Sequence, residues 1–300
     1  MVPHTLRLGG VYAPLPTAFR ADEALDLQEL GLNVARWNAE PLAGYVIGGS
    51  TGEFPLLTPQ ERLEVLRCVV HERPAGRTVI GGASMESTGA TVEMAIACSE
   101  AGADAIIVVT PSYYKGKMTA AALVEHYRMV ADASPVPVVL YNMPANTGVD
   151  LPVPAVVELS AHDNIVGIKE STPDVAKMGL MIHLCSPGFA VLAGSASVLL
   201  GALAAGAVGG VLALANLAAR PLARLTEAFG RGDIEDARKT QLGLIEVNAL
   251  VTERFGVAGL KAALEWIGYY GGPVRHPLIN ISPAEKEQIR AALVGAGLLS

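Results

Sequence analysis

The sequence predicts an α/β protein, a (β/α)8 TIM barrel followed by a C-terminal helical region. Eight short apolar runs alternate with amphipathic stretches, and several of these runs are almost continuously hydrophobic, as in parallel strands covered on both faces. Eight such repeats within about 230 residues match the size of a barrel. The predicted strands are Val11–Thr17, Gly44–Gly49, Val79–Ala83, Ala105–Thr110, Val136–Asn142, Ile165–Glu170, Ala190–Gly194 and Gly209–Ala213.

Capping signals mark where helices begin between these strands. Thr58 and Ser282 each precede Pro and have Glu three residues later, the pattern of a capping box. Thr172 followed by Pro173 repeats the cap-plus-proline pattern. From Asp233 onward the strand pattern stops and only helical stretches follow. We therefore expect a barrel at residues 1–232, with the active site, and a helical region at 233–300 packed on it.

Composition limits the function classes. The 300 residues carry a net charge of -7 and are 51% hydrophobic, which excludes disorder and argues against a nucleic-acid partner, since phosphate binding needs clustered Lys and Arg. Cys68, Cys98 and Cys185 form no CxxC pair, as expected for small buried hydrophobes in a reducing compartment. The first ten residues contain no apolar signal-peptide segment, so a cytoplasmic location is expected.

One long stretch, Met178–Ala219, contains no Asp, Glu, Lys or Arg. Its length alone would permit a membrane span. Pro187 and the glycines at 188, 194, 201, 206, 209 and 210 interrupt it, and it divides into strand, short helix and strand. A buried barrel segment is therefore the favoured interpretation, with a membrane protein as the weaker alternative.

The chemistry of a TIM barrel gathers where its strands end. Lys169 ends the otherwise apolar run NIVGIKES, where poor hydration favours the neutral, nucleophilic amine. A structural alternative pairs Lys169 with Glu170, but adjacent strand residues point to opposite faces. Tyr141 ends the fifth predicted strand and could move protons beside an imine, or it could be a core-edge tyrosine with a solvated hydroxyl.

The segment Gly48–Glu53 supplies hydroxyls and backbone N–H groups after a glycine turn, which suits a carboxylate ligand. It also fits the G-x-S-x-G pattern of a serine nucleophile, but that motif requires a helix starting at the serine, and here the next cap is Thr58. A glycine turn without a ligand is the plainest alternative. The sequence shows no metal or nucleotide motif, and His71, His126 and His183 are expected on helix surfaces.

Four motifs, GSTGE, TPSYY, YNMPANTG and GIKES, occur in an order and spacing that resemble the dihydrodipicolinate synthase / N-acetylneuraminate lyase family. The resemblance covers nearly the whole chain. Long stretches such as VPVVLYNMPANTGVDLP and FGVAGLKAALEWIGYYGGP are most similar to the 4-hydroxy-2-oxoglutarate aldolase branch. The resemblance implies a homotetrameric enzyme, a dimer of dimers, that binds pyruvate as a Schiff base and needs no cofactor or metal.

The resemblance also implies roles for individual residues. Lys169 would form the Schiff base and Tyr141 would shuttle protons. Ser50 and Thr51 would hold the keto-acid carboxylate, and Thr51 would help to relay protons. Tyr113, or alternatively Tyr114, would complete the relay in a neighbouring subunit. The remaining substrate-binding residues would be Gly194 and Val211 in the pyruvate pocket, Ser171 at the distal end of the substrate, and Asn146.

Two positions separate the branches of this family. The synthases carry Arg in a P-x-R-T-G segment, where this chain has Asn146, and Asn cannot make a bidentate charged contact. Thr51 points the other way, because the aldolase branch tends to have Asn there. The favoured hypothesis is cleavage of a 4-hydroxy-2-keto acid to pyruvate and an aldehyde, glyoxylate when the substrate is 4-hydroxy-2-oxoglutarate. The alternatives are 4-hydroxy-tetrahydrodipicolinate synthase, condensing pyruvate with aspartate semialdehyde, and a non-catalytic keto-acid binding protein.

Overall fold

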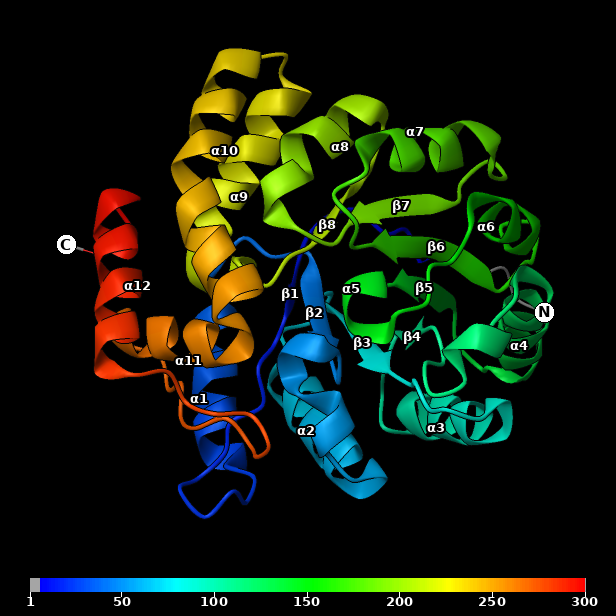
Figure 1. The fold of residues 1–300 in the computed structure, drawn as a ribbon, viewed down its shortest axis with the longest axis horizontal. Helices are drawn as coiled ribbons and strands as arrows, with labels where there is room; N and C mark the ends of the chain where they lie inside the picture. Colours follow the sequence, from blue (N-terminus) through cyan, green and yellow to red (C-terminus); the bar gives the residue numbers. More distant parts are fainter. Residues whose placement is uncertain (1–5, 300) are drawn as a thin grey trace.

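A computed structural model describes residues 6–299, and its centre is a closed barrel of parallel strands in the order β1 to β8. This confirms the predicted fold class (Figure 1). The described strands are β1 Gly10–Pro14, β2 Gly44–Ile47, β3 Thr78–Gly82, β4 Ala105–Val109, β5 Val138–Asn142, β6 Ile165–Glu170, β7 Ala190–Ala193 and β8 Gly209–Val211. Most end earlier than predicted, because hydrogen-bonded pairing stops before the apolar run does.

Helices follow the strands and cover the outside of the barrel (Figure 1). They are α1 Leu27–Trp37, α2 Pro59–Glu72, α3 Thr88–Glu100, α4 Ala120–Ala133, α5 Pro144–Thr147, α6 Val153–Leu159, α7 Val175–Leu184, α8 Leu199–Ala205 and α9 Ala215–Gly230. Short 3-10 turns occupy Ser50–Gly52 (η1), Phe54–Leu56 (η2), Lys115–Lys117 (η3) and Ala196–Val198 (η4).

The C-terminal helices are α10 Ile234–Asn248, α11 Gly256–Trp266 and α12 Pro283–Gly295, with a π-helical turn at Ala249–Arg254 (η5) between the first two. They gather along one side of the barrel beside α9 and α1 (Figure 1). The exact division of the chain at residues 232 and 233 stays a prediction.

Two cores explain the continuous apolar strands. In β4, Ala105, Ile107 and Val109 face the barrel interior, whereas Ile106 and Val108 pack against the surrounding helices. Successive strand side chains alternate between faces, so a strand buried on both sides must be apolar at every position.

The uncharged stretch Met178–Ala219 is part of this barrel. It forms most of α7, then β7, α8, β8 and the beginning of α9. Within residues 6–299, no helix combines the length and the apolar character needed to cross a bilayer.

Two of the three expected helix caps are confirmed. Thr58 and Ser282 each make both hydrogen bonds of a capping box. The expected cap at Thr172 is wrong: the N-cap of α7 is Asp174, whose carboxylate accepts from the backbone N–H of Lys177 at 2.8 Å. The Pro173 ring therefore lies before the helix rather than at its first position.

Glu61, the capping-box acid of α2, also ties this helix to the C-terminal segment. Its carboxylate oxygens accept hydrogen bonds from Arg275 at 2.8 and 2.9 Å. The Arg275 hydrogen bonds, aided by the backbone N–H of Thr58, lower the pKa of Glu61 from 4.5 to about 2. A carboxyl group with a lowered pKa stabilises the fold above its unfolded-state pKa, and this stabilisation is lost as pH falls toward the folded value.

We predict that Glu61→Gln lowers the free energy of unfolding at neutral pH by about 1–2 kcal/mol, through loss of the ion pair and weakening of the cap. The deficit should shrink as pH falls from about 4.5 to about 2, where wild-type Glu61 becomes protonated as well. Urea denaturation of both proteins at several pH values measures this. Glu227→Gln, at an exposed pair with Arg231, is the control, and a deficit independent of pH would contradict the prediction.

Candidate active site

Lys169 lies inside the carboxyl-terminal mouth of the barrel. In β6 it is in register with Tyr141 of β5 and Leu192 of β7, and both of these residues belong to the inner core. Because partners in register share one face of a sheet, the Lys169 side chain points inward. Only 6% of Lys169 is exposed.

The neighbouring acid does not neutralise this lysine. Glu170 is fully buried on the other face of β6, where its carboxylate pairs with Lys177 at 3.2 Å and accepts from the Asn142 amide at 2.9 Å. Within residues 6–299, no carboxylate lies within ion-pair distance of Lys169. The arrangement agrees with the prediction that residues 169 and 170 face opposite ways, and it leaves a buried amine without a counter-ion in the described chain.

Tyr141 is the close neighbour of this amine. The Lys169 Nζ lies 4.2 Å from the centroid of the Tyr141 ring, and Tyr141 is 3% exposed. Its hydroxyl oxygen lies 3.3 Å from Ser50 Oγ, within hydrogen-bond distance. The structure thus brings an amine, a phenol and a hydroxyl together from β6, β5 and the loop after β2.

The loop that carries Ser50 turns tightly. Gly48 has φ of +73°, a conformation that glycine adopts without strain, and residues 50–52 form the 3-10 turn η1. The Thr51 side chain makes no hydrogen bond within the described chain, and it lies beside Ser50 at the same rim. The next α-helix, α2, begins at Pro59, so the context for a serine nucleophile elbow is absent.

Ser171 and Gly194 meet at the ends of β6 and β7. The Ser171 hydroxyl is buried without a hydrogen-bond partner in the described chain. A Cβ added at Gly194 would lie 2.7 Å from Ser171 Cα and 2.8 Å from Ser171 Cβ. Gly194 therefore provides the space that Ser171 occupies. Val211, the last residue of β8, is fully buried in the inner core.

Tyr113 and Tyr114 do not approach the amine within one chain. Their side chains are 78% and 70% exposed and pack edge to face, with ring centroids 5.0 Å apart. Glu86 fixes the backbone beside them, since its carboxylate accepts from the N–H groups of Ser112 at 3.1 Å and Tyr113 at 2.9 Å. Two large aromatic side chains are thus held outward on an ordered loop.

Asn146 lies in the short helix α5, just after Tyr141 and Asn142. It is exposed, and its backbone N–H donates to the carbonyl of Met143 at 3.1 Å. Its side chain makes no hydrogen bond within the described residues, so it is free to contact a ligand at the rim.

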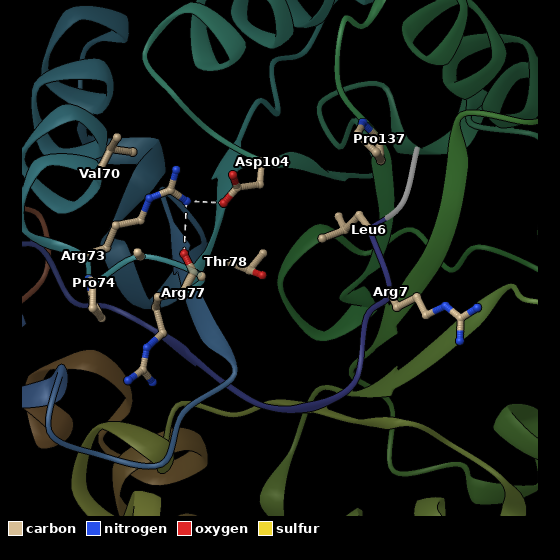
Figure 2. A pocket seen from close by; sticks show the side chains of 11 residues that line it. Leu6, Arg7, Val70, Arg73, Pro74, Arg77, Thr78, Asp104 and Pro137 are labelled. Atoms are coloured by element: carbon tan, nitrogen blue, oxygen red, sulfur yellow. Dashed lines mark hydrogen bonds and ion pairs between the residues drawn. The ribbon is translucent and has the colours of Figure 1, made fainter. Parts of the chain in front are cut away.

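A cavity of about 540 Å³ opens at the opposite end of the barrel, where β3, β4 and β5 begin (Figure 2). Two of the three arginines that line it, Arg73 and Arg77, already have partners. Arg73 binds Asp104 and the carbonyl of Gly102, and Arg77 donates to the carbonyls of Asn38 and Glu40. We assign this end to stability, since the catalytic groups of TIM barrels lie at the other face.

Sequence reasoning missed a buried histidine and a buried ion pair. His126 is 6% exposed instead of lying on the helix surface; its Nδ1 is 2.9 Å from Thr88 Oγ1, and burial lowers its pKa to about 4. Lys261 and Glu53 form a fully buried ion pair of 2.5 Å behind the Ser50 loop.

Within the described part of the chain, no three His, Cys, Asp or Glu side chains lie close enough together to form a metal site.

Comparison with known proteins identifies the family. Residues 7–296 match the model of the dihydrodipicolinate synthetase family. The chain belongs to this family. It is 35% identical to a 4-hydroxy-tetrahydrodipicolinate synthase of Nitrobacter hamburgensis over 97% of both chains. It is 33% identical to a probable mitochondrial 4-hydroxy-2-oxoglutarate aldolase of Emericella nidulans, over 94% of this chain and 93% of that protein.

Solved structures agree with this assignment. YagE, an Escherichia coli K12 prophage protein of the dihydrodipicolinic acid synthase family solved in complex with pyruvate, superposes with a TM-score of 0.91. The two chains are 29% identical, over 97% of this chain and 99% of YagE. The chain is therefore a lyase of the class I aldolase type, as the sequence motifs predicted.

We predict that Gly194→Ala destabilises the protein by about 1–3 kcal/mol, because the new methyl group would overlap Ser171 and force the rim apart. Gly243→Ala is the matched control: this exposed glycine of α10 has no atom within 4 Å of an added Cβ, so the substitution should raise helix propensity without a clash. Thermal unfolding of both variants measures the difference. Equal stability of the two variants would contradict the close packing at Gly194.

Proposed function

We propose that the chain cleaves a 4-hydroxy-2-keto acid, 4-hydroxy-2-oxoglutarate above all, to pyruvate and an aldehyde. The observation that carries this is the buried Lys169 amine above the Tyr141 ring, with the Tyr141 hydroxyl 3.3 Å from Ser50. An amine held out of water and beside a hydroxyl relay suits Schiff-base chemistry on a ketone. The substrate for which the Emericella relative is named and the pyruvate bound to YagE support the substrate class.

The steps follow from this arrangement. The Lys169 amine adds to the C2 carbonyl and water leaves, giving an iminium. Tyr141, through the hydroxyl relay, removes the proton of the C4 hydroxyl. The C3–C4 bond then breaks, the aldehyde departs and the electron pair moves into the iminium, forming an enamine. Protonation of the enamine at C3 and hydrolysis release pyruvate and regenerate the amine, so the iminium nitrogen acts as the electron sink and no cofactor is required.

The surrounding residues receive roles on the same basis. Ser50 and Thr51 would hold the keto-acid carboxylate, with Thr51 assisting the proton relay. Gly194 and Val211 would line the pyruvate pocket, while Ser171 and Asn146 would face the distal end of the substrate. The unpartnered Ser171 hydroxyl supports its role, because a buried donor without a partner gains from a ligand oxygen.

The exposed tyrosines support a role for a second copy of the chain. Tyr113 and Tyr114 cannot complete the relay from their own subunit, and large exposed aromatics are typical of interfaces. We propose that Tyr113 enters the site of a neighbouring subunit in a homotetramer built as a dimer of dimers.

We predict that pyruvate and sodium borohydride together label Lys169, because hydride adds to the iminium carbon and gives a secondary amine that water cannot hydrolyse. Peptide mass spectrometry should find the reduced pyruvate adduct on the peptide that contains residue 169. Lys177→Arg is the control, since it removes a nearby amine on the other face of β6 but keeps a positive charge beside the buried Glu170, so labelling should stay in place. An unlabelled wild-type chain, or full turnover by Lys169→Ala, would refute Schiff-base catalysis.

We predict that the enzyme releases pyruvate from 4-hydroxy-2-oxoglutarate faster than it condenses pyruvate with aspartate semialdehyde. The reason is that Asn146 offers no guanidinium for the carboxylate of aspartate semialdehyde. Asn146→Arg should shift the ratio of the two rates toward condensation, whereas Ala145→Arg, an exposed change in the same turn, should not. Parallel assays over a panel of hydroxy-keto acids measure this. Faster condensation by the wild type would favour the synthase, and labelling without turnover would favour a binding protein.

A further inference from the structure

A buried ion pair joins the C-terminal helices to the loop of the candidate site. Lys261 of α11 and Glu53 are 1% and 0% exposed, and Lys261 Nζ lies 2.5 Å from Glu53 Oε1. The ammonium also donates to the carbonyl of Pro273 at 2.7 Å. The second carboxylate oxygen of Glu53 accepts from the backbone N–H of Arg275 at 2.9 Å. These contacts join Glu53, in the loop after β2, to residues 261–275 of the C-terminal region.

An aromatic ring completes this enclosure. Lys261 Nζ lies 4.5 Å from the centroid of the Phe19 ring, and Arg275 Cζ lies 4.4 Å from the same centroid. Removing a lysine and a glutamate from water is costly, and it is repaid only when geometry and hydrogen bonding are favourable. Well-packed apolar residues of similar volume often replace a buried ion pair with no loss of stability, so the pair calls for a reason besides stability.

The position of Glu53 supplies that reason. It directly follows the Ser50–Gly52 turn and has φ of +56°, a conformation that costs a non-glycine residue energy and persists only when its surroundings enforce it. Its N–H donates to the carbonyl of Ser50 at 3.1 Å. Glu53 Oε1 has no hydrogen-bond partner in the described chain, and its contact with a charged group is the ion pair with Lys261. The carboxylate therefore anchors the strained end of the turn that presents Ser50 and Thr51.

We propose that Lys261 is a positioning residue for the active site: its ion pair with Glu53 holds the Ser50–Thr51 turn in the conformation that binds the keto-acid carboxylate. The C-terminal helix α11 would then shape the site, although the proposed reactive groups, Lys169, Tyr141 and Ser50, all lie on the barrel. The proposal rests on the proposed function for its ligand, whereas the geometry of the turn is independent of that function.

The test compares wild type with the double variant Glu53→Gln/Lys261→Met. This pair removes both charges with little change in shape, and so avoids the lone buried carboxylate that Lys261→Met alone would leave. In folded protein, KM for the keto acid should rise by about 10- to 100-fold, the loss expected for hydrogen bonds to a charged group, while kcat falls less. Borohydride trapping by pyruvate should slow at low pyruvate and recover at saturation.

A second readout does not depend on activity. Hydrogen–deuterium exchange should accelerate in the peptide that contains residues 49–57, whose amides close the two 3-10 turns. The control is Asn33→Ala, because the buried Asn33 side chain also binds the C-terminal segment, at the carbonyl and N–H of Tyr270, by bonds of 2.7 and 2.9 Å. This variant should lose stability without a change in KM or in exchange at residues 49–57.

The outcomes separate the two claims. Wild-type protein that pyruvate fails to label at Lys169 refutes the proposed function, and the exchange measurement still decides whether Lys261 positions the turn. A folded double variant with wild-type exchange at residues 49–57 overturns the positioning role. Faster exchange with an unchanged KM overturns the link between the turn and substrate binding, and leaves the pair as a structural contact.

Discussion

The closed parallel register of β5, β6 and β7 is the constraint on which the site depends. It places Tyr141, Lys169 and Leu192 on one level of the barrel interior, so a lysine one residue from a strand end is surrounded by core. A shift of one residue would exchange Lys169 with Glu170, because side chains alternate between faces. The amine would then lie among the outer helices, where Lys177 and Asn142 now satisfy the acid.

The order and type of the barrel elements could be predicted because each strand is buried on both faces and leaves a local signature of continuous apolar residues. Lys169 and Tyr141 became candidates for the same reason, as polar residues at the ends of such runs, and the structure brings their side chains together. The predicted cap at Thr172 was wrong because a threonine before proline resembles an N-cap. The side chain that accepts from the N-terminus of α7 belongs to Asp174. Strand ends were misplaced because pairing depends on neighbouring strands, which no single segment encodes.

Buried polar contacts between distant segments were beyond local patterns, although their residues left weak signals. His126 shares the helical spacing of Leu123, Tyr127 and Val130, all buried on one face of α4, and that spacing predicts burial better than its polarity predicts exposure. Lys261 is the sole charged residue between Gly256 and Leu264. Its partner is about two hundred residues away in the chain, so only the fold could identify Glu53 as the counter-ion.

These buried charges connect the stability of the fold to the placement of its reactive groups. The barrel provides rigid strand ends for Lys169 and Tyr141, but Ser50 and Thr51 stand on a loop, and loops need restraint from elsewhere to be precise. Glu53 gains that restraint from α11 and from the backbone of Arg275, while Glu61 holds the Arg275 guanidinium from α2. The C-terminal segment that includes Lys261 and Arg275 thus contacts the loop of Ser50 and Thr51 through Glu53, and the following helix through Glu61. In the proposed site, α11 therefore acts at the mouth of the barrel, because it contacts the turn that would hold the carboxylate of the substrate.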